Sequence, residues 1–245
     1  MNKKNRLIFA AFLAAAALLR CFQMLTGFDA AGLPEPSGLP GLLLPVVLLA
    51  AAVFFFLAAR QLPGRRLLTD EMRSYFRFPD MPAVLCSVAG SFAVLAGGAL
   101  TLLRSGGTAM ILLLGVFACA AALCVLLSVF SLYRGENPQG VLLLVPVCAL
   151  AVYLVFLYRV DAANPILAEI YIEILAVAAL TYSSLERAAF AFRNGSPRVF
   201  LWSSAMAAIL SACAAAELRS LAASLIFLGF ALVEAGFLLA ADLKP

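Results

Sequence analysis

Residues 109–132 read AMILLLGVFACAAALCVLLSVFSL and contain no charged side chain. A hydrocarbon core about 30 Å thick is crossed by roughly 20 residues of α-helix, so this run is long enough to span a bilayer. The strands of a membrane β-barrel alternate apolar and polar residues, and this run does not alternate. The stretch therefore predicts a transmembrane helix.

Apolar runs of similar length recur along the chain, separated by short polar or charged connections. Each has close to the length that one membrane crossing requires. The predicted spans are residues 7–26, 39–59, 83–103, 109–132, 140–158, 165–185, 199–216 and 220–240. The sequence thus predicts an all-α integral membrane protein of about eight transmembrane helices.

The composition agrees with this class and narrows the chemistry. Of the 245 residues, 65% are hydrophobic and 12% charged, whereas soluble domains carry about 25% charged residues. The chain has no histidine, the commonest metal ligand and general base, and its six cysteines lack CxxC spacing and are interpreted as packing residues. No phosphate-binding loop, nucleophile elbow or HExxH motif occurs. We therefore expect no metal, cofactor or nucleic-acid partner, and an enzyme is disfavoured.

The basic residues predict the orientation in the membrane. With the N-terminus inside, thirteen lysines and arginines fall in the cytoplasm, whereas Arg104, Arg159 and Arg219 fall outside, as the positive-inside rule requires. The thirteen are Lys3, Lys4, Arg6, Arg60, Arg65, Arg66, Arg73, Arg77, Arg134, Arg187, Arg193, Arg198 and Lys244. Both termini are thus predicted to be cytoplasmic in a bacterial-type plasma (inner) membrane.

Short matches between the two halves suggest an internal repeat. FDAAG resembles VDAAN, YFRF resembles AFRN, and LLRS resembles ELRS, in the same order and at equivalent places in the topology. These matches predict a parallel four-plus-four tandem repeat, with halves at 1–135 and 136–245 in one membrane domain. Chance similarity in a background rich in leucine and alanine is the alternative.

Polar residues inside the spans are the candidate binding site. Glu169 and Glu173 lie one helical turn apart near the outer end of the sixth span, and Arg20 lies at a matching depth in the first span, one turn from Gln23. Charged groups within a membrane are costly and mark functional sites by default. These four residues would line a polar cavity open to the outside, for a charged solute or a proton. Alternatively, Arg20 and Glu173 form a structural ion pair, or Arg20 reaches the outer headgroups.

Two further features each admit two interpretations. Glu234 lies in the inner half of the last span without an obvious partner, which suits either a second relay group or a protonated acid in helix packing. The connection at residues 60–82 predicts a short helix with Met72, Tyr75 and Phe76 on one face, lying on the inner leaflet. Its arginines would contact anionic lipid or a partner protein: Arg65, Arg66, Arg73 and Arg77. An ordinary basic loop is the alternative.

The sequence leaves the function open between two main hypotheses. The first is a transporter or permease for a small solute or ion, which uses the polar site in the outer half of the bundle. The second is a non-transporting subunit or regulator, which binds a partner protein or anionic lipid through its basic cytoplasmic loops. An enzyme embedded in the membrane is a third, weaker hypothesis.

Overall fold

A computed structural model of the chain describes residues 3–26, 39–62, 72–76, 78, 81–106, 108–161, 167–217 and 220–242. Within these residues the chain forms nine helices, eight of them long and apolar enough to cross a membrane. Their bounds are α1 Lys3–Thr26, α2 Leu39–Arg60, α3 Met72–Tyr75, α4 Met81–Leu103, α5 Ala109–Tyr133, α6 Gly140–Asp161, α7 Leu167–Ala191, α8 Pro197–Ala215 and α9 Leu221–Ala240. The prediction of an all-α membrane protein with eight spans is confirmed.

The helix ends follow local sequence signals. Ser196 caps α8 by accepting a hydrogen bond from the Val199 amide, with Pro197 as the first helical residue, and Ser220 caps α9 by accepting one from Ala223. The largest difference from the predicted spans is at α7, which continues to Ala191 rather than ending near residue 185. This extension brings Arg187 into the helix.

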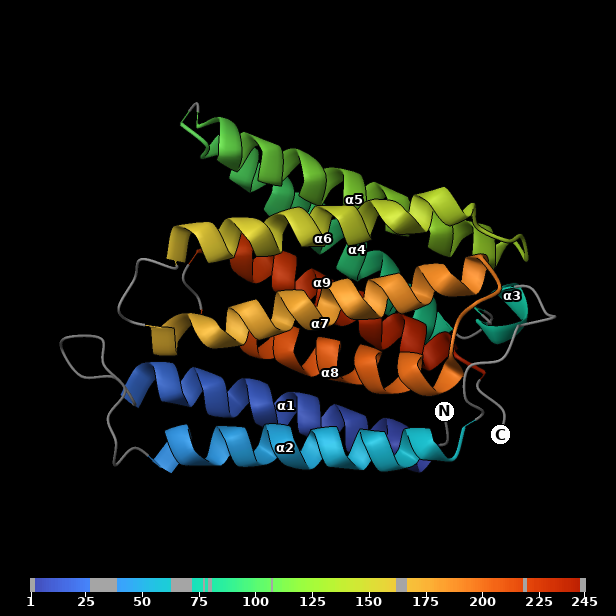
Figure 1. Cartoon of the computed structure of the whole chain (residues 1–245), viewed down its shortest axis with the longest axis horizontal. Coiled ribbons are helices and arrows are strands. Elements are labelled where there is room, and N and C mark those ends of the chain that lie inside the picture. The colour runs from blue at the N-terminus through green and yellow to red at the C-terminus, as the bar shows by residue number, and fades with distance from the viewer. Residues whose placement is uncertain are drawn as a thin grey trace.

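The eight long helices form one bundle, and both chain termini lie at the same end of it (Figure 1). We call this the terminal end, and the opposite end, where α1, α4, α6 and α8 finish, the distal end. Helices α1 and α2 pack on α8 at one side, whereas α4, α5 and α6 lie at the other (Figure 1). Helices α7, α8 and α9 occupy the middle, and α8 is the most deeply buried span.

The most extensive helix contact joins α4 to α9 through glycines. A Cβ atom built on Gly90 would lie 2.5 Å from the Gly229 carbonyl oxygen, and one on Gly97 would lie 2.7 Å from the Ala222 carbonyl oxygen. Only glycine permits so close a backbone approach. The third predicted span, α4, thus packs its glycines against the eighth, α9.

The short helix α3 is docked onto the terminal end of the bundle. Met72 and Phe76 are 2% and 1% exposed, Phe76 pairs through its backbone with Ala241, and the Asp242 amide donates to the Tyr75 carbonyl oxygen at 2.8 Å. The prediction that this apolar face lies on the leaflet is therefore wrong, because the face packs on protein. The four-plus-four repeat stays a prediction from the sequence.

Candidate functional site

Arg20 lies at the centre of a polar cluster in the distal half of the bundle. It is about 9 Å from the end of α1, at 1.5 Å per residue, and is completely buried. Its Nη2 lies 2.7 Å from Glu217 Oε1 and its Nη1 donates to Gln23 Oε1 at 2.9 Å. The guanidinium also lies 5.9 Å from the centre of the Tyr171 ring. We call these four residues the Arg20 cluster.

The ion pair found for Arg20 differs from the one that the sequence suggested. Matching depths had paired Arg20 with Glu173, whereas the structure pairs it with Glu217, two residues after the end of α8. The Glu217 side chain is only 2% exposed, so both charges are removed from solvent. The bridge ties the distal ends of α1 and α8 together.

Glu173 has a partner of a different kind. The Tyr153 hydroxyl of α6 donates to Glu173 Oε1 at 2.7 Å, and Glu173 is 6% exposed. A hydrogen bond from a hydroxyl group suits either protonation state of a carboxyl group, because the hydroxyl can donate or accept. Glu169 belongs to α7, but its side chain lies outside the described part of the structure.

A second polar cluster surrounds Arg187 in the half nearer the terminal end. Arg187 Nη2 lies 3.2 Å from Glu234 Oε1 and donates to Ser184 Oγ at 3.0 Å. Ser183 and Ser204 both donate to Glu234 Oε2, at 2.7 and 2.6 Å. All five side chains are at most 1% exposed, and they join α7, α8 and α9. We call them the Arg187 cluster.

The hydrogen bonding of the Arg187 cluster is incomplete. Within the described residues, Arg187 Nη1 has no hydrogen-bond partner, and Glu234 Oε1 receives the arginine only as an ion pair, without a well-aligned N–H. A buried donor without a partner costs about 1–3 kcal/mol, and more when it is charged. The guanidinium instead stacks at 4.5 Å from the centre of the Phe237 ring. The cluster thus contains one donor atom, Arg187 Nη1, and one acceptor atom, Glu234 Oε1, that form no hydrogen bond within the described residues.

An aromatic cluster closes the Arg187 cluster from the terminal end. Phe76 lies with its ring centre 5.0–5.7 Å from those of Phe190, Phe200 and Phe237, in edge-to-face packing. All four rings are at most 1% exposed. The Arg187 guanidinium stacks on the Phe237 ring, and Phe237 packs against Phe76. The docked segment is therefore in packing contact with the Arg187 cluster.

Arg187 and Glu217 are the functional candidates that the sequence reasoning missed. Arg187 was assigned to the cytoplasm because the apolar run seemed to end before it, but helix α7 continues past it and Glu234 neutralises it. Glu217 was noticed only inside the ELRS match, because it follows the predicted seventh span, 199–216, rather than lying within it. Ser183 and Ser184, adjacent in the sequence and close to Arg187, are a polar signal that could have pointed to this cluster.

The basic connection is described only in part. Arg73 donates to the Gly135 carbonyl oxygen at 3.2 Å, and its backbone amide donates to Asn137 Oδ1 at the same distance. Arg73 thus links α3 to the connection between α5 and α6. Arg65, Arg66 and Arg77 lie outside the described residues.

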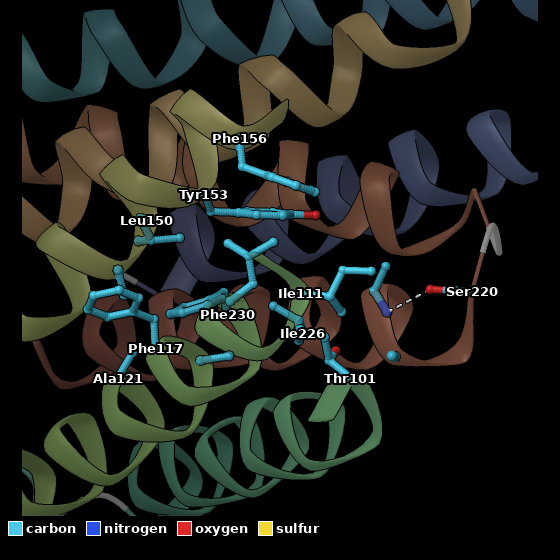
Figure 2. A pocket seen from close by; sticks show the side chains of 15 residues that line it. Thr101, Ile111, Phe117, Ala121, Leu150, Tyr153, Phe156, Ser220, Ile226 and Phe230 are labelled. Carbon is cyan, nitrogen blue, oxygen red and sulfur yellow. Dashed lines mark hydrogen bonds between the residues drawn. The ribbon is translucent and has the colours of Figure 1, made fainter. Parts of the chain in front are cut away.

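A cavity of about 230 Å³ lies in the distal half of the bundle, between α4, α5, α6 and α9. In Figure 2, Tyr153 and Phe156 line one side, and Phe230 and Ile226 lie across from them. Twelve of its fifteen lining residues are apolar; the other three are Thr101, Tyr153 and Ser220. Arg20, Gln23 and Glu173 do not line it, so this cavity differs from the polar one expected for these residues.

No protein-family model matches this chain, and no curated protein or solved structure shows significant similarity to it. Its function is therefore inferred from its own residues.

Proposed function

We propose that this chain is a transporter of a small solute or ion, in a bacterial plasma membrane with its terminal end in the cytoplasm. The supporting observation is the pair of buried ion pairs near opposite ends of one bundle. Arg20–Glu217 joins α1 to α8 at the distal end, and Arg187–Glu234 joins α7 to α9 towards the terminal end. The two pairs act as gates, and the described arrangement is closed at both.

The unused hydrogen-bonding capacity of Arg187 favours a gate over an ion pair that serves only stability. A pair kept only for stability is expected to satisfy all its donors, because each unsatisfied buried group costs free energy. Arg187 Nη1 and Glu234 Oε1 lack hydrogen bonds within the described residues. A second state of the bundle, in which water or solute reaches these atoms, would satisfy them.

Glu173 and Glu234 are the groups that would carry a proton or cation. They lie on α7 and α9, at different depths, and each accepts hydrogen bonds from hydroxyl groups. A hydroxyl can donate to a carboxylate or accept from a carboxylic acid, so each site tolerates a change of protonation. Glu234 is then both a proton carrier and a partner in the gate nearer the terminal end.

Cys213 reports on the distal gate. It is fully buried and lies one helical turn before Glu217 on α8. In a variant retaining Cys213 as its single cysteine, a membrane-impermeant maleimide should react slowly from the distal side. Glu217→Gln should accelerate the reaction and Glu234→Gln should slow it further, because alternating access closes one gate when the other opens. Faster labelling in both variants would mean general loosening and would contradict the gating proposal.

Proton movement gives an independent readout of transport. In vesicles containing the protein and an internal pH dye, a potassium-valinomycin potential should drive acidification faster than in empty vesicles. Glu173→Gln should abolish the difference, whereas Glu136→Gln, on the exposed connection after α5, should not. Equal rates for protein-containing and empty vesicles would exclude protons and direct the assay to small solutes.

The docking of α3 favours a second candidate, a subunit or regulator that binds a partner or anionic lipid. Because Phe76 is fixed in the bundle and Arg73 is exposed, this part of the basic connection is held at the terminal end in a defined position. Stoichiometric co-purification of a second protein, lost in Arg73→Glu and accompanied by no flux, would support this function over transport.

A further inference from the structure

We propose that the cavity between α4, α5, α6 and α9 is a binding site for one hydrocarbon chain of an anionic phospholipid, with its phosphate at the distal surface. This inference is independent of the proposed transport function. It rests on the shape, the polarity and the charged rim of the cavity.

The cavity is elongated along the helix axes. On α9 its lining runs from Ser220 to Phe230, and on α5 from Ile111 to Ala121, each about 15 Å at 1.5 Å per residue. The long axis therefore follows the membrane normal, which is the direction of a lipid chain. Figure 2 shows Ser220 at one extreme of the lining and Ala121 near the other.

The walls offer little to a polar occupant. Three lining residues carry hydroxyl groups, and each is already engaged: Thr101 donates to the Gly97 carbonyl oxygen, Tyr153 donates to Glu173, and Ser220 accepts from the Ala223 amide. A charged or strongly polar solute would lose its hydration here without replacement. A hydrocarbon chain loses nothing of that kind and gains close contact with the aromatic rings.

Two arginines supply charge complementarity at the distal rim. Arg104 follows the lining residue Thr101 by three positions, directly after α4, where its amide still donates to the Leu100 carbonyl oxygen; Arg159 follows Phe156 by three positions on α6. Each therefore shares the face of a lining residue, about 4.5 Å further towards the distal surface. Both are exposed, and neither makes an ion pair within the described residues. Guanidinium groups at this level suit a phosphate, which selects an anionic lipid over a zwitterionic one.

The test uses the full-length protein in nanodiscs and two photoreactive lipids that differ only in headgroup. Phosphatidylglycerol and phosphatidylcholine analogues, each with a diazirine near the chain end, are activated and the labelled peptides are mapped. We expect labels on α5, α6 and α9 lining residues, with phosphatidylglycerol labelling about 25-fold stronger, from about fivefold for each of the two nearby arginines. Labels spread evenly over the exposed faces of α1 and α2 would overturn the proposal.

Variants that fill the cavity separate this site from the general lipid surface. Ala118→Leu and Ala223→Leu each place a larger side chain in the lining and should lower labelling by both lipids about tenfold, the effect of excluding roughly two methylene groups. Ala151→Leu, on the exposed side of α6, is the matched control and should change nothing. Because Ala223 is near the distal mouth, its variant tests the site even if Ala118→Leu does not fold. Unchanged labelling in Ala223→Leu would overturn the proposal.

Rim variants test the headgroup. Arg104→Gln combined with Arg159→Gln should reduce phosphatidylglycerol labelling to the phosphatidylcholine level, whereas Arg134→Gln, at the terminal end, should keep the preference. Equal labelling by the two lipids in the unmodified protein would show an apolar site without headgroup selection and would overturn the assignment to anionic lipid. Photocrosslinked dimers in place of lipid adducts would identify a second copy of the chain as the occupant, against the proposal.

Discussion

The Arg187 guanidinium lies 3.2 Å from the Glu234 carboxylate, and neither side chain is more than 1% exposed. The two residues come from α7 and α9, 47 positions apart in the sequence. Ser183 and Ser204 both donate hydrogen bonds to the Glu234 carboxylate, whereas Arg187 Nη1 has no hydrogen-bond partner within the described residues. The pair is thus well screened from lipid but incompletely satisfied.

Arg187→Met and Glu234→Leu are expected to destabilise the protein strongly when made singly. Each leaves an uncompensated buried charge, which typically costs about 3–5 kcal/mol. The double variant should recover a large part of this loss, since it removes both charges. Thermal unfolding in detergent, as a double-mutant cycle, gives the coupling energy.

Arg193→Met, at an exposed position beyond the end of α7, is the control for loss of a positive charge and should leave the midpoint unchanged. Additive effects of the two buried changes would contradict a direct interaction between Arg187 and Glu234.

Arg20 should couple more strongly to Glu217 than to Glu173. Arg20→Leu and Glu217→Gln remove the two ends of a 2.7 Å bridge, so their effects on stability should be strongly non-additive. Glu173→Gln keeps an acceptor for the Tyr153 hydroxyl and should cost less. Thermal unfolding of the three single and two double variants decides between the two acids. A larger coupling energy with Glu173 would contradict the Arg20–Glu217 pair and support the Arg20–Glu173 pair suggested by the sequence.

Gly90→Ala is expected to force α4 and α9 apart. The added Cβ would lie 2.5 Å from the Gly229 carbonyl oxygen, which backbone cannot avoid by a rotamer change. Overpacking of this kind typically costs about 1–3 kcal/mol. Thermal unfolding measures the loss.

Gly41→Ala is the matched control in α2, where the nearest atom to a new Cβ is Gln23 Nε2 at 3.6 Å. It should be neutral or stabilising by about 0.5–1 kcal/mol, because alanine favours a helix over glycine. Similar losses for both substitutions would mean that the α4–α9 approach is not tight.

Phe76→Ala is expected to release α3 from the terminal end. Truncating a buried phenylalanine typically costs about 3–5 kcal/mol, and Phe76 packs against three other rings. Limited trypsin digestion should then cut after the exposed Arg73 much faster than in the unmodified protein. Phe92→Ala, on the exposed face of α4, is the control and should leave the cleavage rate unchanged. An unchanged rate in Phe76→Ala would mean that the Phe76 ring does not anchor α3.

The helices were predictable because the membrane imposes one simple requirement, about 20 apolar residues for each crossing. Their side-chain partners were not, because depth along a helix says nothing about its rotation or its neighbours. Depth along the helices matched Arg20 with Glu173, whereas the packing of α1 on α8 brings Arg20 to Glu217. The local hydropathy pattern also failed to predict that Arg187 lies within α7. The acid that neutralises it, Glu234, is distant in the sequence.

The apolar cavity could not have been predicted for a related reason. Its lining residues are ordinary members of four apolar runs, and apolar residues facing a cavity, a neighbouring helix or lipid have the same composition. Arg104 and Arg159, at its rim, are two of the three arginines that the sequence predicted to lie outside. Their clustering around one opening depends on the order of helices in the bundle.

The glycine contact between α4 and α9 also bears on how the chain is made. Gly229 is synthesised 139 residues after Gly90, which at about 5–20 residues per second is a delay on the order of ten seconds. During that interval the glycine face of α4 must be covered by lipid or by a membrane chaperone. A ribosome that stalls before α9 would therefore leave an inserted but incomplete bundle, whose open α4 face offers quality-control proteases a means of recognising the unfinished protein.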